Sequence, residues 1–442
     1  MSIHKEKGNL LMRVLGLIVE YNPFHNGHLY HLEQAKSMCN ADFVVCVMSG
    51  NFIQRGEPAI INKWARTRMA LQYGIDLVIE LPVPYAMSSA EFFAYGAVKI
   101  LNDIGVVDYL CFGSENADID TFSTIADILI DEPESYKQIL KQSLAKGISF
   151  PASRELALKN YLCEKGFQTF DIEAVISSPN NILGIEYIKA LKRLNSRIVP
   201  LSIKRINNSY NSTQITGSIS SATSIRKLIG TGRSARAPLL AYATEADKKQ
   251  LDMVLPANCL KILEDEFNSG RGPIYPNLYE QLVISSIRRM TTEELKLLPY
   301  VKEGMENRIK SAAAACGTLD ELIENISTKR YTRTRVQRIL SSLMTGFTSE
   351  EFDTFNKFGG PQYARILGLN NKGRQLLSKI NKSSHLPIIT KTANFSKSCN
   401  PLLKRMLEVE SFATDMYVLG YSNPIYRKAG QEFTQNVIIS KE

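Results

Sequence analysis

The segment from Gly16 to His31, GLIVEYNPFHNGHLYH, constrains the fold of this 442-residue chain more than any other stretch. An apolar, β-branched run over 14–19 predicts a buried parallel strand, and Asn22-Pro23 predicts the turn that ends it. From Asn26 onward the apolar residues follow helical spacing. His25-Asn26-Gly27-His28 therefore lies where a strand gives way to a helix N-terminus, and the backbone N–H groups there favour phosphate.

Histidines are concentrated in this segment, because three of the five in the chain, His25, His28 and His31, lie within it. A chance surface histidine at a turn is one interpretation, and a zinc site with His-x-x-His spacing is another. No cysteine pair or HExxH glutamate accompanies the histidines, and Gly27 allows a phosphate to approach the backbone closely. We therefore favour a nucleotide site over a metal site, with His25 and His28 donating to phosphate oxygens as charge builds on a leaving pyrophosphate.

Length and composition limit the broad class of the protein. A chain of 442 residues predicts two or three domains, and its net charge of +9 favours a polyanionic partner. Seven cysteines without a C-x-x-C pair indicate a reducing compartment, hence the cytoplasm, and no apolar run is long enough for a membrane span. Residues 1–12 are expected to be an N-terminal extension, with both Met1 and Met12 open as the start.

The first half of the chain alternates short apolar runs with amphipathic segments, which is the pattern of a parallel α/β sheet. Ligands gather at the carboxyl ends of such strands. Polar, glycine-rich or basic residues follow four of the predicted strands, so one rim of the sheet is suited to a nucleotide. The predicted strands are 14–19, 42–48, 76–82, 108–112 and 197–205.

A second candidate phosphate element is the stretch from Ser220 to Lys227, SSATSIRK. Hydroxyl side chains at a helix start usually cap it, and that alone would explain the stretch. The alternative is a phosphate cradle, in which hydroxyls and Arg226 face ATP phosphates. The two roles are compatible.

From about residue 235 the pattern becomes mainly helical, so we expect domains at 13–234 and 235–442. The predicted helices are 247–263, 279–290, 295–314, 319–326, 331–344 and 364–380. Several basic residues in this half favour contact with a phosphate backbone over a merely solvated helix face. The candidates for RNA binding are Arg330, Arg333, Arg335, Arg338, Lys372 and Arg374.

Seven stretches together resemble the HIGH-motif nucleotidyltransferase superfamily and, more narrowly, the bacterial tRNA(Met) cytidine acetate ligases. The resemblance is strong in the first half and loose in the helical half. His-x-Gly-His alone marks only the superfamily, and the block from Met48 to Arg66 is far more specific. The stretches are Val19–His28, Met48–Pro58, Lys63–Arg66, Glu80–Pro82, Phe112–Glu115, Pro179–Gly184 and Ser220–Arg226.

The resemblance implies a Rossmann-like nucleotidyltransferase domain followed by a helical RNA-binding region. It also implies a reaction in which acetate and ATP, with Mg²⁺, give acetyl-adenylate, and the acetyl group passes to N4 of the wobble cytidine of elongator tRNA(Met). His25, His28 and Arg226 would be catalytic. The implied ATP contacts are Ile18, Val19, Glu20, Tyr21, Asn22, Pro23, Phe24, His25, Asn26, Gly27, His28, Leu29, Tyr30, His31, Gly113, Asn180 and Arg205.

The second phosphate motif of the superfamily usually reads Ile-Ser-Ser-Thr-x-Ile-Arg, and here Ala222 interrupts it. Ser221, Thr223 and Ser224 are the candidates to meet phosphate, and the sequence leaves open which of them does so. Two competing functions also remain. One is a small-molecule adenylyltransferase without an RNA substrate, which the basic helical half disfavours. The other is a non-catalytic RNA-binding protein, which intact His25, His28 and Arg226 disfavour.

Overall fold

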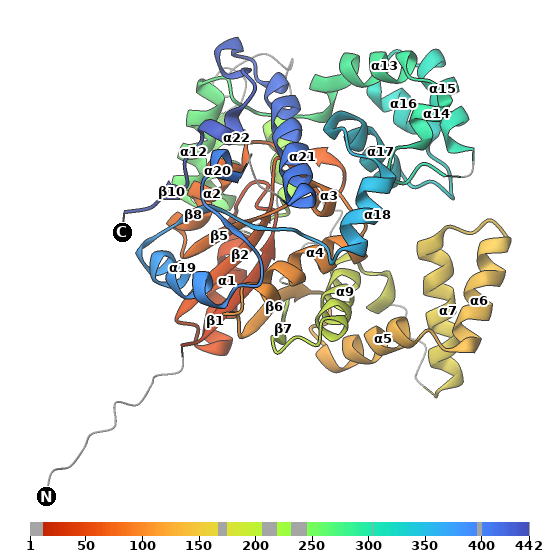
Figure 1. Ribbon diagram of the computed structural model, residues 1–442, viewed down its shortest axis with the longest axis horizontal. Coiled ribbons are helices and arrows are strands. Elements are labelled where there is room, and N and C mark those ends of the chain that lie inside the picture. The colour runs from red at the N-terminus through yellow and green to blue at the C-terminus, as the bar shows by residue number, and fades with distance from the viewer. Residues whose placement is uncertain are drawn as a thin grey trace, which may run out of the picture.

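The computed structural model describes residues 12–166, 175–205, 219–230, 245–302, 304–395 and 400–441. Within these residues, eight strands form one sheet in the order β10-β8-β5-β2-β1-β6-β7, with β9 also pairing with β8 (Figure 1). The strands are β1 Val14–Val19, β2 Phe43–Ser49, β5 Leu77–Leu81, β6 Tyr109–Ser114, β7 Val199–Lys204, β8 Ala364–Leu369, β9 Ile388–Ile389 and β10 Ile438–Ile439. A separate antiparallel hairpin pairs β3 (Phe52–Ile53) with β4 (Glu57–Pro58).

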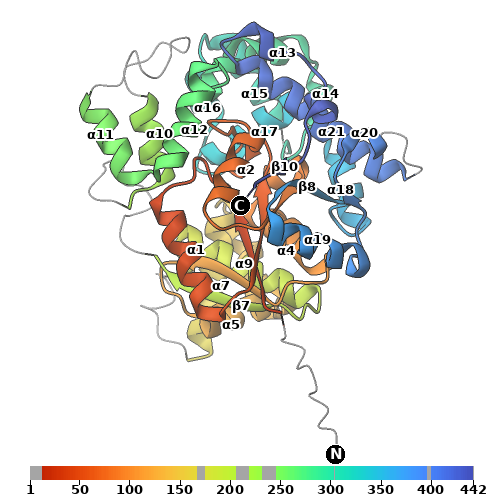
Figure 2. The same cartoon turned by 90° about the vertical axis from the view of Figure 1, so that its left-hand side faces the viewer.

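Helices cover both faces of the sheet, as expected for strands that are apolar on both sides. Leu15 and Leu17 of β1 face the core built with α1, α2 and α12, whereas Val14 faces the core that includes α4, α9 and α19. Figure 2 shows α1 on one side of the strands and α4 and α19 on the other. These helices are α1 Asn26–Cys39, α2 Lys63–Gln72, α4 Ala90–Asp103, α9 Pro179–Arg193, α12 Ala257–Asn268 and α19 Asn371–Ser383.

The remaining helices lie around this sheet or extend from it. In the first half they are α3 Val83–Ala86, α5 Ile119–Asp131, α6 Glu134–Ala145, α7 Phe150–Glu164 and α10 Ala222–Gly230. In the second half they are α11 Glu245–Val254, α13 Glu280–Arg289, α14 Thr292–Lys296, α15 Met305–Ala315, α16 Leu319–Ile326, α17 Arg333–Thr345, α18 Ser349–Lys357, α20 Thr392–Phe395, α21 Pro401–Tyr417 and α22 Gln431–Thr434.

Three helix predictions in the second half are wrong. The stretch 247–263 is divided into α11 and α12 at Pro256, and 295–314 is divided into α14, which ends at Lys296, and α15, which begins at Met305, with Pro299 between them. Proline cannot continue a helix, because it lacks the backbone N–H.

The stretch 364–380 was also expected to be a single helix, but its first part is β8, which runs antiparallel to β5, and only the rest belongs to α19. A short apolar run such as ARILGL fits a buried strand as well as a helix, so periodicity alone cannot separate them. Asn370 then starts α19 by accepting a hydrogen bond from the backbone N–H of Gly373 at 2.9 Å.

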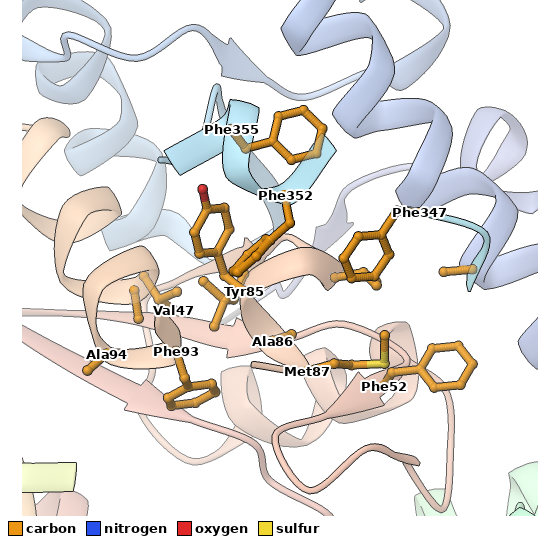
Figure 3. Close-up of a cluster of buried hydrophobic side chains, with 14 of the residues drawn as sticks. Val47, Phe52, Tyr85, Ala86, Met87, Phe93, Ala94, Phe347, Phe352 and Phe355 are labelled. Carbon is orange, nitrogen blue, oxygen red and sulfur yellow. The ribbon is translucent and has the colours of Figure 1, made fainter. Parts of the chain in front are cut away.

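The sheet therefore takes strands from both sides of the expected domain boundary. Residues 1–11 and 231–244, where the extension and the boundary were placed, lie outside the described residues. An aromatic cluster also joins the two halves (Figure 3): the ring of Phe352 in α18 lies 5.7 Å from that of Tyr85 in α3. As a division into domains, 13–234 and 235–442 stays a prediction.

Two further sequence expectations concern the environment of the chain. Six of the seven cysteines lie in the described residues, and each is a free thiol. Among the helices that the structure describes, none combines the length and the apolar character needed to cross a membrane.

A buried ionic cluster holds the C-terminal helices against the sheet. The ammonium of Lys63 in α2 contacts Glu80 of β5, Glu410 of α21 at 3.0 Å and Glu432 of α22 at 2.5 Å. Arg365 of β8 also pairs with Glu80 and Glu432. Burial and the neighbouring Glu80 raise the pKa of Glu410 to about 8. A proton on Glu410 balances the two cations against the remaining two carboxylates.

We expect Lys63→Met to lower the free energy of unfolding by about 3–5 kcal/mol, because buried carboxylates would lose their cation. Urea unfolding followed by circular dichroism measures the change. Lys261→Met on the exposed side of α12 is the matched control and should have little effect. A loss below about 1 kcal/mol for Lys63→Met would show that the cluster does not stabilise the fold.

Candidate active site

His25 caps helix α1, which is an unusual role for histidine. Its Nδ1 accepts a hydrogen bond from the backbone N–H of Gly27 at 3.1 Å. The backbone N–H of His25 in turn donates to Nδ1 of His28 at 3.3 Å, so the two residues form a reciprocal capping box. Because Nδ1 accepts in both rings, each neutral imidazole carries its proton on Nε2. The first turn of α1 thus presents two Nε2–H donors beside its backbone N–H groups.

The histidines of this motif are held neutral. Burial, reinforced by the charges of Arg205 and Arg226, lowers the pKa of His25 to about 3. Burial, then His25 and Arg205, lower the pKa of His28 well below its usual value. Burial and Arg205 lower the pKa of His31 to about 4. These rings therefore act as hydrogen-bond donors near neutral pH and do not contribute positive charge of their own.

Ring packing fixes the orientation of the pair. The rings of His25 and His28 stack with their centroids 3.7 Å apart. Tyr21 packs edge-on against His28 at 5.0 Å, and Phe24 lies 5.7 Å from it. His25 itself is only 7% exposed. The donors are therefore preorganised, which is what stabilising charge in a transition state requires.

The Ser220–Lys227 stretch lies next to this motif, as the sequence suggested. A Cβ at Gly27 would lie 3.4 Å from Cγ2 of Ile219, so the starts of α1 and α10 adjoin. Arg226 crosses between them, because its Nη1 donates to the carbonyl of Asn22 at 2.9 Å. Burial lowers the pKa of Arg226, although Glu57 and Glu20 oppose this effect.

The hydroxyls of this stretch divide into two groups. Ser221 accepts from the backbone N–H of Ser224 at 3.1 Å, and their hydroxyl oxygens lie 2.6 Å apart. Thr223 lies beside Arg226, whose Nη2 is 3.5 Å from its hydroxyl oxygen. The capping role is thus present for Ser221, and Thr223 is the hydroxyl paired with the catalytic candidate arginine.

A second group of predicted ATP contacts gathers at the ends of β6 and β7. A Cβ at Gly113 would lie 3.4 Å from Cγ of Arg205 and 3.7 Å from Cδ2 of His31, so these three residues adjoin. Asn180 is bound to Glu115, which follows β6, through a 2.7 Å hydrogen bond. The structure therefore brings Gly113, His31 and Arg205 together and holds Asn180 near the same end of β6.

The sequence did not point to Arg66 as a site residue, although Lys63–Arg66 is one of the stretches on which the family resemblance rests. This fully buried guanidinium on α2 donates to the carbonyls of Glu20 at 2.6 Å and Ser49 at 3.0 Å, and also to that of Gly50. It ties the carboxyl ends of β1 and β2 together. Such a role depends on three-dimensional proximity, which the local sequence pattern does not show.

The basic helix α17 approaches the same rim through the β3–β4 hairpin. Nε of Arg338 donates to the carbonyl of Gln54 at 2.9 Å, and the hydroxyl of Ser341 donates to that of Gly56 at 2.7 Å. Burial lowers the pKa of Arg338. This arginine, predicted to bind RNA, is therefore engaged in holding α17 to the rim.

The other basic candidates of this segment differ in their surroundings. Arg330 and Arg333 are exposed, and Arg333 pairs with Asp320 at 2.7 Å. Arg335 donates to the carbonyl of Tyr300 at 2.7 Å and is half-buried. Arg330 and Arg333 are thus exposed cations near the start of α17.

Lys372 and Arg374 lie elsewhere. Lys372 donates to the carbonyl of Asp42, which precedes β2, at 3.1 Å. Asn370, which caps the same helix, donates to Asp76, the residue before β5, at 2.9 Å. These contacts place the start of α19 at the amino ends of the parallel strands, opposite to the rim that carries the histidines.

Within the described ranges, no group of three or more histidine, cysteine, aspartate or glutamate side chains is arranged to hold a metal ion. Both carboxylate oxygens of Glu115 already accept, one from Asn180 and one from the backbone N–H of Asn181.

Comparison with known proteins agrees with this geometry. The family model described as HIGH Nucleotidyl Transferase matches residues 12–432. The tRNA(Met) cytidine acetate ligase of Acetivibrio thermocellus is 60% identical over 97% of this chain and 100% of its own length. The ligase of Halothermothrix orenii is 44% identical over 97% of this chain and 99% of its own length. This chain belongs to the tRNA(Met) cytidine acetate ligase family.

Solved structures of this ligase family share the whole fold. Thermotoga maritima TmcAL without ligand superposes with a TM-score of 0.91 at 35% identity, covering 98% of this chain and 100% of the other. A second structure of that protein, bound with alpha-thio ATP, superposes with a TM-score of 0.89 at the same identity and coverage. The α/β nucleotidyltransferase fold predicted from the sequence is confirmed.

We expect His28→Ala to keep the fold but to lower acetate-dependent ATP–pyrophosphate exchange by about 10²–10³-fold, as for loss of one preorganised donor. The exchange rate and the thermal midpoint are measured together. A matched control is His385→Ala, which removes an exposed histidine far along the chain. Unchanged exchange in His28→Ala would refute the catalytic role, and loss of bound zinc would favour the metal alternative.

Proposed function

We propose that the protein activates acetate with ATP, forming acetyl-adenylate, and transfers the acetyl group to N4 of the wobble cytidine of elongator tRNA(Met). The observation that carries this proposal is the rim where the starts of α1 and α10 adjoin, with neutral His25 and His28 beside Arg226. Curated relatives named tRNA(Met) cytidine acetate ligase support it over nearly the whole chain. The neighbour solved with alpha-thio ATP supports ATP as the nucleotide.

In the first step an acetate oxygen attacks the α-phosphorus of ATP, and pyrophosphate leaves. The protein needs no nucleophile of its own, because positioning and stabilisation of charge are sufficient. The Nε2–H groups of His25 and His28 and the guanidinium of Arg226 supply donors for the phosphate oxygens. Thr223 is the hydroxyl that we place with them, because it lies beside Arg226.

Mg²⁺ would enter with ATP as part of the substrate. The carboxylate of Glu115 is occupied by Asn180 and Asn181, so it does not offer free oxygens to a cation. Mg²⁺ commonly binds substrate phosphates and keeps several of its waters. We place the reaction in the cytoplasm, where a tRNA substrate is available.

The tRNA would approach from the side of α17. Arg330 and Arg333 are exposed at the start of this helix, whose middle part is held to the rim by Arg338 and Ser341. Lys372 and Arg374 lie at the opposite end of the strands, so the proposed surface does not include them. Arg335 and Arg338 act within the protein, where they position α17.

The test is transfer of radiolabelled acetate to elongator tRNA(Met) in the presence of ATP. We expect the label to map to the wobble cytidine, with AMP as the co-product, and to vanish when that base is replaced. A small-molecule adenylyltransferase would instead leave AMP attached to its product. Label that never enters tRNA while AMP accumulates on a metabolite would overturn the proposal.

Two double variants in the same assay test the RNA surface. Arg330→Ala with Arg333→Ala should raise the tRNA concentration for half-maximal transfer and reduce its salt dependence, because fewer counterions are released. Lys372→Ala with Arg374→Ala is the matched control and should leave both unchanged. Equal effects of the two pairs would argue against the assigned face.

A further inference from the structure

Glu20 is a carboxylate at the centre of the rim whose role the adenylation step does not explain. It directly follows β1, and its Oε1 accepts a hydrogen bond from the backbone N–H of Gln54 at 2.8 Å. Its own carbonyl accepts from Arg66 at 2.6 Å. Among the described residues, Oε2 has no hydrogen-bond partner, and it is not one of the fully buried unpaired side-chain atoms. One oxygen of this carboxylate is therefore available to a substrate.

Glu20 lies between the nucleotide motif and α17, the helix that we propose faces the tRNA. On one side, Arg226 approaches it from the nucleotide motif. On the other side, Gln54 bonds to Glu20 through its N–H and to Arg338 of α17 through its carbonyl. The carboxylate thus stands where the ATP side of the rim meets the helix proposed to face RNA.

Several other carboxylates near the strand ends already accept hydrogen bonds or pair with cations. Glu115 accepts with both oxygens from Asn180 and Asn181. Glu266 is shared by Arg68 and Arg271. The buried carboxylates of the ionic cluster around Lys63 likewise face cations.

The histidines of the motif are poor candidates to accept a proton. Both Nδ1 atoms of His25 and His28 already accept backbone hydrogen bonds, which leaves protonated Nε2 atoms as donors. Accepting a further proton would place a positive charge in a buried site next to Arg205. Glu20 is a rim group able to take a proton.

Acetyl transfer requires such a group. The exocyclic amine of cytidine is a weak nucleophile, because its lone pair is delocalised into the ring, and it becomes strongly acidic once it attacks a carbonyl carbon. A positioned base that removes this proton contributes about 10²–10⁴-fold to the rate.

We propose that Glu20 is the general base for acetyl transfer, an inference that rests on the proposed function. N4 of the wobble cytidine attacks the carbonyl carbon of acetyl-adenylate, forming the C–N bond. Glu20 takes one proton from N4, and the C–O bond to the phosphate breaks with its electron pair leaving on AMP. Acetylated tRNA, AMP and a proton, later released from Glu20 to solvent, are the products.

The electrostatic surroundings of Glu20 suit a base. Burial raises the pKa of its carboxyl group, whereas the Gln54 N–H and the charges of Arg226, Arg66 and Arg55 oppose the rise. Arg338 of α17 and Tyr187 of α9 also act on it electrostatically. A raised pKa makes the carboxylate a stronger base. Because the deprotonated form is the active one, the transfer rate should rise with pH through this pKa and then level off.

The test is a single-turnover measurement that supplies synthetic acetyl-adenylate and elongator tRNA(Met), so that adenylation is bypassed. We expect Glu20→Gln to slow transfer by about 10²–10⁴-fold and to abolish the rise of the rate with pH. The amide oxygen of glutamine can still accept from Gln54, so the thermal midpoint should be retained. Glu134→Gln is the matched control, an exposed carboxylate on α6 bound by Gln138, and should transfer within about threefold of the wild type.

Several outcomes would overturn the assignment. If the Glu20→Gln protein transfers at the wild-type rate, or keeps the pH dependence, then Glu20 is not the general base. An equal loss in transfer and in ATP–pyrophosphate exchange would mean that Glu20 positions the nucleotide instead. Failure of the wild-type protein to transfer acetyl from supplied acetyl-adenylate would instead overturn the proposed function itself.

Discussion

The hydrogen bond from the Gly27 backbone N–H to Nδ1 of His25 is the interaction on which the rest of the site depends. It starts α1, fixes the tautomer of the first histidine and, with the reciprocal bond to His28, directs two donors toward the nucleotide side of the rim. A serine or aspartate cap would start the helix equally well but would supply no such donors. The same contact thus serves both the fold and the proposed chemistry.

The surroundings maintain this arrangement by linking strand ends that are distant in sequence. Arg66 binds the carbonyls that end β1 and β2, and Arg226 binds the carbonyl of Asn22 beside the histidines. Through Gln54, the β3–β4 hairpin joins Glu20 to α17. Farther along the sheet, the ionic cluster around Lys63 fastens α21 and α22. A rim assembled from so many segments is rigid, which favours preorganised donors over ones recruited by substrate.

Local patterns made much of this predictable from the sequence. The strand and helix on either side of the histidines and the helix that contains Arg226 were predicted because apolar periodicity and capping residues act within a few positions. The strand β8 was missed, because a buried six-residue apolar run has no periodicity that separates strand from helix. Roles that depend on proximity were also missed: Arg66 and Arg338 bind carbonyls far away in the sequence. Charge alone grouped Lys372 with Arg333, although the fold places them at different ends of the molecule.

The most direct test of the central claim is a measurement of the imidazole ¹⁵N shifts of His25 and His28 by nuclear magnetic resonance. The two residues are assigned by comparison with single His→Gln variants. With the pKa of His25 lowered to about 3, the account predicts that both rings stay neutral, with the proton on Nε2, from about pH 8 down to about pH 5. Titration of either ring near its ordinary pKa, or a proton on Nδ1, would contradict it.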